Sequence, residues 1–302
     1  MIISSTRDWK GSFERWAQPP SDTEQARCAN AESMVRKAIQ ASQRLQSRNV
    51  DVFTQGSYAN RTNVRANSDV DVAVACGSIF YFDLPTGSNR SDFGLTNEAD
   101  YSYSEFKQDV HEALSKYFGP GAVTRGNKAF DIKATSHHVE ADVVPFVDYR
   151  EYFGNRTHRD GFTLFPDKGG KIENYPKQHY TNGINRNSAT SQRFKRVARV
   201  LKGVCYEMQD NNIGVSQRIP GFLLECLAGL APTSMYSSPD ITVTTGNVVA
   251  WLFNNTEPES DCTEWTELSN IKYLYRNSQP WTKADTHQFM LDLWQYVGFK
   301  NS

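Results

Sequence analysis

Residues 55–74 read QGSYANRTNVRANSDVDVAV, in which a Gly-Ser pair precedes an Asp-Val-Asp segment. Side chains alternate along a β-strand, so Asp69 and Asp71 point to one face while the intervening valines point to the other, into a core. Two carboxylates on one face can share a divalent cation. Gly56 and Ser57 open an expected short helix, whose unpaired N–H groups favour an anion. The segment therefore predicts phosphate-and-metal chemistry, and a surface strand with two solvated acids is the simpler alternative.

Length and charge narrow the function classes. The chain has 302 residues, enough for a large core in one or two domains, and a formal net charge of −1. This balance argues against a protein that mainly coats nucleic acid and favours small charged substrates. The first residues lack the apolar run of a signal peptide, and no later segment has the apolar length that crosses a bilayer. We therefore expect a cytoplasmic location without membrane contact.

The cysteines and histidines carry no metal or disulfide signature. The five cysteines are odd in number, widely spaced and without a Cys-x-x-Cys pair. They indicate neither a disulfide framework nor a zinc site, so we expect reduced, mostly buried thiols. The six histidines show no ligand spacing and receive no role.

The first half of the chain alternates helical and strand patterns. Ser21 and Glu24 form a capping box that opens a predicted helix over residues 22–47. Residues 77–100 are rich in Ser, Asn, Asp and Gly and predict a loop. Strands are expected at 50–54, 69–76, about 122–148 and 171–174, and a second helix over about 106–117.

The second half is helical by pattern. Apolar residues from Phe194 to Met208 recur at steps of three and four, and shorter apolar segments continue the pattern to residue 297. We therefore predict an α+β fold with two lobes and a central cleft. Residues 1–185 would form a catalytic core of mixed sheet and helices, and residues 186–302 a helical domain that closes the cleft.

A third carboxylate would complete a two-cation site. Two cations held about 3.5–4 Å apart activate the attacking oxygen and stabilise leaving pyrophosphate in nucleotidyl transfer. Asp142 is the best candidate, because its apolar strand can lie beside that of Asp71 and a buried strand does not tolerate an unpaired carboxylate. Glu140, on the same face, competes with it. An all-oxygen site of this kind suits two Mg²⁺ ions, which Mn²⁺ can replace.

A basic stripe follows on the predicted helix around residue 200. Lys195, Arg199 and Lys202 recur at steps of four and three, hence on one helix face. The stripe could neutralise a triphosphate, although a solvated cationic face commonly shows the same spacing.

Together these motifs resemble the DNA polymerase beta-like nucleotidyltransferase superfamily. The likeness is strongest to the branch with oligoadenylate synthase, cyclic GMP-AMP synthase and the bacterial DncV-like cyclic-oligonucleotide synthases of antiphage defence, including the CdnE-like clade. It covers roughly residues 20–230. It rests on Gly56-Ser57, Asp69-x-Asp71, Asp142, Asn174–His179, the helix ending in Lys202, and Ile219–Leu227.

The resemblance implies roles for individual residues. By this resemblance, Asp69, Asp71 and Asp142 would hold the two Mg²⁺ ions. Phe222 occupies the position where relatives stack an aromatic ring on a base, although a core position fits the apolar segment 222–224 nearly as well. Asn174 would face the nucleobase, and its amide can pair with a uracil or adenine edge. The remaining residues implied to bind the nucleotide through its phosphate groups are Gln55, Gly56, Ser57, Lys195 and Lys202.

The implied activity is the condensation of NTPs into a cyclic di- or oligonucleotide, with pyrimidine NTPs as expected substrates. The implied partner is an effector protein that the product activates, and we expect a monomer. The zinc-binding insertion of the animal DNA sensor is absent, so direct activation by long DNA is not expected. Gly221 stands where relatives often carry Ser.

Two alternatives remain open from the sequence. One is template-independent nucleotidyl transfer to an RNA end, a protein or a small molecule. The other is a nucleotide-binding module without turnover. The bases joined, the linkage, the ring size and the activating signal are not specified by the residues.

Overall fold

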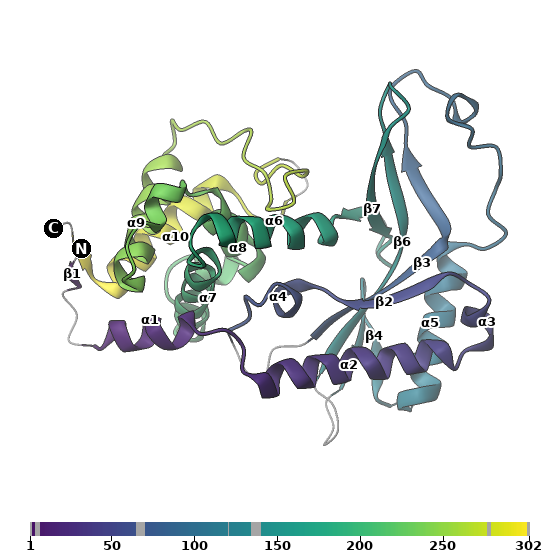
Figure 1. The fold of residues 1–302 in the computed structure, drawn as a ribbon, viewed down its shortest axis with the longest axis horizontal. Coiled ribbons are helices and arrows are strands. Elements are labelled where there is room, and N and C mark those ends of the chain that lie inside the picture. Colours follow the sequence, from purple (N-terminus) through teal and green to yellow (C-terminus); the bar gives the residue numbers. More distant parts are fainter. Residues whose placement is uncertain are drawn as a thin grey trace. The chain divides into compact units, whose positions relative to one another are not determined.

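A computed structural model of the chain describes residues 2–3, 7–64, 70–119, 121–133, 140–276 and 279–300. The described elements confirm the predicted α+β class (Figure 1). Among the described residues, none of the helices combines the length and the apolar character that a membrane crossing requires. The chain divides into a sheet unit, Ser21–Tyr58 and Asn67–Pro176, and a helical unit, Met1–Pro20, Ala59–Ala66 and Lys177–Ser302.

This division differs from the predicted boundary between residues 185 and 186. Residues 1–20 and 59–66 lie within the predicted catalytic core, yet they group with the helical unit. Helix α1 (Trp9–Ala17) shows the reason, because its buried Trp9 and Phe13 belong to the apolar core of the helical unit. Burial of an apolar helix stripe, rather than position along the chain, decides where this segment belongs.

Two parallel strands, β3 (Val70–Asp83) and β6 (Ala141–Tyr152), form the centre of the sheet unit. The described strands run in the order β2-β3-β6-β5-β4, and β7 and then β8 extend from the second half of β6. The remaining strands are β2 (Val50–Thr54), β4 (Val123–Arg125), β5 (Phe130–Ile132), β7 (His158–Leu164) and β8 (Ile172–Asn174).

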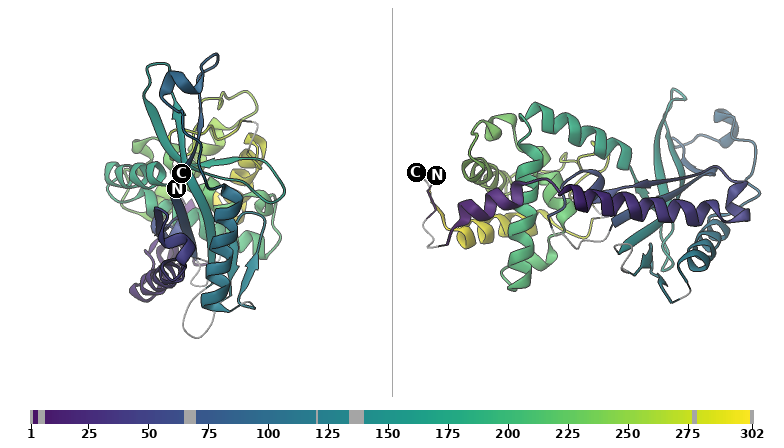
Figure 2. Two further views of the ribbon diagram at one scale, coloured as in Figure 1. Left: turned by 90° about the vertical axis from the view of Figure 1, so that its right-hand side faces the viewer. Right: turned by 60° about the horizontal axis from the view of Figure 1, so that its bottom comes forward.

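Two helices cover the sheet. α2 (Asp22–Gln40) and α5 (Tyr103–Phe118) lie against each other and against the strands (Figures 1 and 2). Each begins with a capping box, and the predicted Ser21–Glu24 box is confirmed. The predicted helix over 22–47 is interrupted, because α3 (Gln43–Gln46) follows α2 as a separate turn. Helix α4 (Gly56–Ala59) is the expected short helix after β2.

Part of the predicted loop at 77–100 is wrong. Strand β3 continues to Asp83, with a register shift between Cys76 and Phe80. The β-branched and aromatic residues 79–82 favour a strand and outweigh the Gly-Ser pair before them. Beyond β3, the described part of the segment contains the 3₁₀ helix η1 (Arg90–Phe93).

Helix α7 (Phe194–Asp210) is the centre of the helical unit. The predicted stripe from Phe194 to Met208 is confirmed, since its apolar residues are fully buried. Strands β1 (Ile2–Ile3) and β9 (Phe299–Lys300) pair at the chain ends. The other elements are α6 (Pro176–Ala189), η2 (Ser216–Arg218), α8 (Gly221–Leu230), η3 (Thr233–Tyr236), α9 (Ile241–Asn255) and α10 (Lys283–Val297).

The prediction of buried thiols is also confirmed. All five cysteines lie in the described ranges, are buried and form no disulfide. Burial raises the pKa of the Cys28 thiol to about 12.

α1 and α7 are far apart in sequence but approach closely. They lie side by side in Figure 1, with Gly203 of α7 against the ring of Trp16 of α1. A Cβ atom at Gly203 would lie 2.5 Å from Trp16 Cδ2, closer than real contacts allow. The missing side chain therefore sets the distance between the two helices.

We expect Gly203→Ala to lower the free energy of unfolding by about 1–2 kcal/mol, because overpacking against Trp16 exceeds the gain in helix propensity of about 1 kcal/mol. The matched control is Gly183→Ala in α6, where the nearest atom, Leu268 Cδ2, is 3.4 Å from the new Cβ. This control should be neutral or slightly stabilised. Urea unfolding of the three proteins measures both effects, and a Gly203→Ala protein as stable as the control would contradict the packing argument.

Candidate active site

Asp71 and Asp142 are neighbours in the sheet. They are register partners in the parallel pair of β3 and β6, and such partners project from the same face. Both side chains are half-buried. The predicted pairing of the Asp142 strand with the Asp71 strand is therefore confirmed. Asp69 lies outside the described residues, and its metal role stays a prediction.

Two further acidic residues lie near Asp71 and Asp142 in the hydrogen-bonded sheet. Glu140 is exposed and precedes β6, and its carbonyl accepts a hydrogen bond from the Val70 N–H at 3.0 Å. Glu140 thus lies just before the paired part of β6, whereas Asp142 lies within it. This placement favours Asp142 over Glu140 as the third metal ligand. Asp131 of β5 is the antiparallel register partner of Asp142. Asp131 is not among the residues predicted for the site, although the alternation of buried Phe130, exposed Asp131 and buried Ile132 is a recognisable strand signal.

Gly56 lies directly against the carboxylate of Asp71. The Gln55 N–H donates to the Asp71 carbonyl at 2.8 Å, which brings the start of α4 to this point of β3. Gly56 has a φ of +66°, and a Cβ atom there would lie 2.1 Å from Asp71 Oδ2. Both observations require glycine, because other residues are strained at this φ and would collide with the acid. Gln55 and Ser57 are half-buried beside it.

The residues present fit a divalent cation with oxygen ligands. Asp71 and Asp142 offer carboxylates on one face, and the lack of a side chain at Gly56 leaves space at Asp71. Across the ranges that the structure describes, no three Asp, Glu, His or Cys side chains form a group able to hold a metal. Asp71 and Asp142, two of the three predicted ligands, lie in the described chain, whereas Asp69 lies outside it.

Asn174 ends the short strand β8. The predicted strand near residues 171–174 is confirmed, and Asn174 is half-buried opposite Phe162 of β7. The next residue, Tyr175, packs against Gly161, where a Cβ atom would lie 2.7 Å from its ring. This contact fixes the end of β8, and base recognition by Asn174 stays a prediction.

The basic stripe of α7 does share one face, but most of that face is buried. Arg199 is 4% exposed, and its guanidinium donates to the carbonyls of Arg61, at 2.7 Å, and Ala17. Lys195 is half-buried, and burial lowers the pKa of its ammonium group. Its Nζ lies 6.0 Å from the ring centroid of Tyr180. The solvated-face interpretation is therefore wrong for Arg199, and phosphate binding by Lys195 stays a prediction.

Lys202 is part of a buried polar network in the helical unit. It is 2% exposed, and its Nζ donates to Glu225 Oε2 at 2.7 Å and to the Thr62 hydroxyl at 2.9 Å. The Thr62 hydroxyl in turn donates to Glu225, and His179 Nε2 lies 3.1 Å from Glu225 Oε1. In this structure the Lys202 charge is neutralised by Glu225, and its predicted contact with phosphate stays untested.

Glu225 is the centre of that network. Burial alone would raise the pKa of its carboxyl, but the Lys202 ammonium and the hydrogen bond with His179 outweigh burial and hold the pKa well below its usual value. The carboxylate is therefore ionised at neutral pH, with hydrogen-bond partners on both oxygens. A buried charge of this kind is tolerated because it is paired and hydrogen-bonded.

Phe222 is an exposed aromatic residue. Its side chain is 41% exposed, whereas Leu223 and Leu224 are fully buried, so the core alternative for Phe222 is wrong. Its ring stacks on His179, with centroids 5.4 Å apart and planes at 29°. The Trp281 ring is also near Phe222, with centroids 6.1 Å apart and planes at 43°. No role is predicted for His179 from the sequence, because a single histidine carries no spacing signal.

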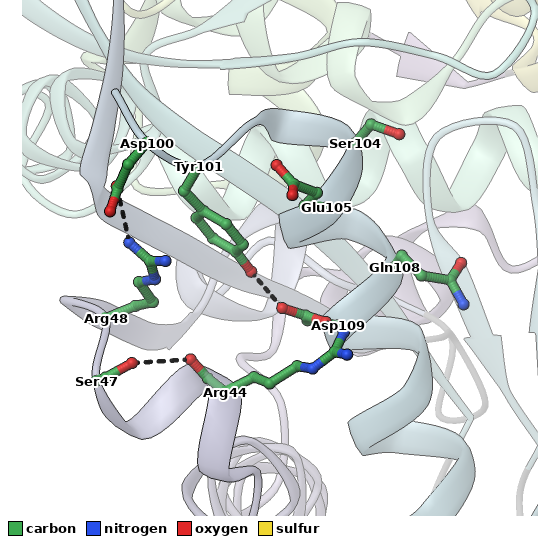
Figure 3. A pocket seen from close by; sticks show the side chains of 9 residues that line it. All are labelled: Arg44, Ser47, Arg48, Asp100, Tyr101, Ser104, Glu105, Gln108 and Asp109. Carbon is green, nitrogen blue, oxygen red and sulfur yellow. Dashed lines mark hydrogen bonds and ion pairs between the residues drawn. The ribbon is translucent and has the colours of Figure 1, made fainter. Parts of the chain in front are cut away.

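A cavity in the sheet unit lies between α3 and the start of α5. Its volume is about 590 Å³, and four of the charged groups that line it form two ion pairs (Figure 3). Arg44 and the Tyr101 hydroxyl both bind Asp109, at 2.8 and 2.7 Å, and Arg48 pairs with Asp100 at 3.2 Å. These pairs tie α3 to α5, which gives the cavity a structural explanation.

Comparison with known proteins finds similarity along nearly the whole chain. Residues 181–298 match the family model of the cGAS/DncV-like nucleotidyltransferase C-terminal helical domain. The chain is 44% identical over 285 residues to the cyclic dipyrimidine nucleotide synthase CdnE of Cecembia lonarensis, covering 94% of this chain and 96% of that protein. Identity to the protein of the same name from Legionella pneumophila is 37% over 294 residues, with 96% and 98% covered.

The similarity extends to solved structures. The CdnE c-UMP-AMP synthase of Rhodothermus marinus, solved with Apcpp and Upnpp, gives a TM-score of 0.83 at 28% identity. The match covers 97% of this chain and 98% of that one.

We expect Glu225→Gln to lower the free energy of unfolding at pH 7 by about 3–5 kcal/mol, because it leaves the Lys202 ammonium buried without its counter-charge. Glu225 has a lowered pKa, so its contribution is fully present above the unfolded pKa of about 4.3 and is lost as the pH falls below it. The difference in stability between wild type and variant should therefore shrink between about pH 5 and pH 3.

The matched control for this experiment is Glu267→Gln. Glu267 is also buried, but burial raises the pKa of its carboxyl, so the ionised form is the unfavourable one in the native state. Its amide variant should be neutral or stabilised at pH 7. Unfolding in urea at a series of pH values tests both, and a Glu225 variant whose deficit stays constant down to pH 3 would contradict the lowered pKa.

Proposed function

The chain belongs to the CdnE group of the cGAS/DncV-like nucleotidyltransferases, and we propose that it joins two pyrimidine nucleoside triphosphates into a cyclic dinucleotide. A ribose hydroxyl of one nucleotide attacks the α-phosphate of the other. The bond to the β-phosphate breaks, pyrophosphate leaves and the hydroxyl proton passes to solvent. A second condensation of the same kind closes the ring, so that two triphosphates yield one cyclic product and two pyrophosphates.

One observation carries the proposal more than any other. Asp71 and Asp142 are register partners on one sheet face, and Gly56 lies against Asp71 with no room for a side chain. This arrangement brings three separate parts of the chain together: β3, β6 and the start of α4. It is what a site for an anionic, metal-bound triphosphate requires.

The names of the relatives support the choice of bases. Both nearly full-length relatives reported above are called cyclic dipyrimidine nucleotide synthases, at 44% and 37% identity. In our proposal, the Asn174 amide pairs with the polar edge of a pyrimidine, since it offers one donor and one acceptor.

The proposed site uses the following division of tasks. When bound, two Mg²⁺ ions would activate the attacking hydroxyl and stabilise the leaving pyrophosphate, and Asp69, Asp71 and Asp142 would hold them. Gly56 keeps the Asp71 carboxylate accessible. Gln55 and Ser57 would bind the donor triphosphate, and Lys195 would bind phosphate, whereas Lys202 is buried and paired with Glu225. The exposed ring of Phe222 would stack on a base.

We also propose a biological role on the basis of the family resemblance. The cyclic product would act as a second messenger in antiphage defence and would activate a separate effector protein. The enzyme would act in the cytoplasm as a monomer. Detection of the product in cells after phage challenge, with loss of protection on deletion of a product-binding effector, would test this role.

Product analysis tests the activity directly. Purified protein is incubated with Mg²⁺ or Mn²⁺ and each NTP labelled on its α-phosphate in turn, with the other three unlabelled, and the products are then treated with phosphatase. We expect a phosphatase-resistant product labelled by pyrimidine NTPs. A resistant product labelled by purines alone would contradict the base choice. Phosphatase-sensitive oligomers would indicate terminal transfer, and no product with either metal would favour a binding module.

We expect Gly56→Ala and Asp142→Asn each to lower turnover by at least about a hundredfold without unfolding the protein, because both disturb the Asp71–Asp142 pair. The matched control is Gly87→Ala. Gly87 also has a positive φ, +82°, but within the described part of the chain no atom beyond the adjacent residues lies within 4 Å of its Cβ position. Alanine there is strained by its backbone conformation but meets no neighbouring side chain. The control should keep wild-type turnover, and loss of activity in it would show that backbone strain alone explains the Gly56 variant.

A further inference from the structure

One side of the exposed Phe222 ring rests on a fixed partner. Phe222 and Glu225 are three residues apart on α8, so they are neighbours on the helix surface. His179 of α6 contacts both, because it stacks on the Phe222 ring and its Nε2 lies 3.1 Å from Glu225 Oε1. The histidine thus connects an exposed ring to a buried carboxylate.

The orientation of the His179 ring is defined by this hydrogen bond. His179 is 6% exposed, and a carboxylate can only accept, so Nε2 carries the proton and donates to Glu225. An apolar side chain of similar size would fill the same space, but it could rotate. The polar anchor selects one ring plane, and that plane is stacked at 29° to the plane of Phe222.

The anchor is itself held without help from His179. Glu225 uses Oε1 for His179 and Oε2 for Lys202 and Thr62, so the two oxygens have separate partners. The start of α8 is also packed closely, since a Cβ atom at Gly221 would lie 2.6 Å from the Tyr206 hydroxyl. Both the backbone that carries Phe222 and the carboxylate beneath His179 are therefore fixed.

We propose that His179 is a positioning residue that holds the Phe222 ring in the orientation that stacks on the nucleotide base, with Glu225 as its anchor. The inference rests on the stacking role given to Phe222 in the proposed function. It adds that the ring is pre-oriented in the free protein, which lowers the entropic cost of ordering it when the nucleotide binds.

The test measures the affinity for a non-hydrolysable UTP analogue by titration calorimetry, with Mg²⁺ present. Phe222→Ala should weaken binding about tenfold through lost stacking. His179→Gln, which keeps a donor for Glu225 but loses the ring, should weaken binding about three- to tenfold. In the double variant, the loss should be close to that of Phe222→Ala alone, because His179 acts through the ring. Additive losses would overturn the proposal, as would a His179→Gln protein that binds within twofold of wild type.

A matched control is available in the same unit. His287 also stacks on a phenylalanine, Phe253, with centroids 4.4 Å apart, and its Nδ1 lies 3.2 Å from the Phe253 carbonyl oxygen. His287→Gln removes a similar ring pair and should leave the affinity for the analogue unchanged. If it weakens binding as much as His179→Gln does, the effect is general destabilisation and the proposal fails.

A measurement on the wild-type protein guards against loss of folding in the variants. The resonance of the His179 Nε2–H, identified by nitrogen-15 labelling of histidine, should shift when the analogue binds. It should not shift in Phe222→Ala, a substitution at a side chain that is 41% exposed. An unchanged resonance at saturation in wild type would overturn the proposal. This test measures binding and not turnover. If the losses of affinity at His179 and Phe222 are non-additive but the protein forms no cyclic product from NTPs, this inference is retained and the proposed function is rejected. If Phe222→Ala binds like wild type, the inference itself fails.

Discussion

The parallel hydrogen-bonded ladder between β3 and β6 determines the geometry of the sheet unit. It places Asp71 opposite Asp142, and a slip of one residue would move one of the two acids to the other face. The Gln55 N–H bonds to the same stretch of β3 and brings Gly56 against Asp71. β7 joins the other edge of β6 and carries β8 with Asn174. The acids, the glycine and the amide are thus all positioned by one ladder.

The helical unit depends on a different constraint, the burial of charge. Lys202 and Glu225 are both almost fully buried, and the loss of hydration is offset only because each charged group meets a partner of opposite charge and further hydrogen bonds. An apolar pair could give similar stability, so the ion pair is better explained by what it positions. It connects α7, α8, the start of α6 and the segment that contains Thr62, and it has Phe222 as its neighbour at the surface.

The sequence was informative where a periodic pattern coincided with a chemical motif. The Asp71 strand, the Asp142 strand and the α7 stripe followed from alternation and helical spacing, and the structure confirms their placement. The interior position of Arg199 and Lys202 did not follow, because the spacing of charged residues along a helix does not say which face is covered. His179 was missed for a related reason, since its partners Glu225 and Phe222 lie on another helix. Residues 79–82 were misassigned because their composition was averaged with that of a polar segment.

The reactivity of the buried thiols can be used to measure local unfolding of this protein. Cys28 and Cys76 lie in the sheet unit, and Cys205, Cys226 and Cys262 lie in the helical unit. A thiol reacts with an alkylating reagent as the thiolate, and burial both shields these groups and raises the pKa of Cys28 and Cys226. Alkylation of the native protein must therefore wait for a transient opening around each sulfur. Peptide-resolved alkylation rates would consequently give a separate opening free energy for each unit, without any introduced label.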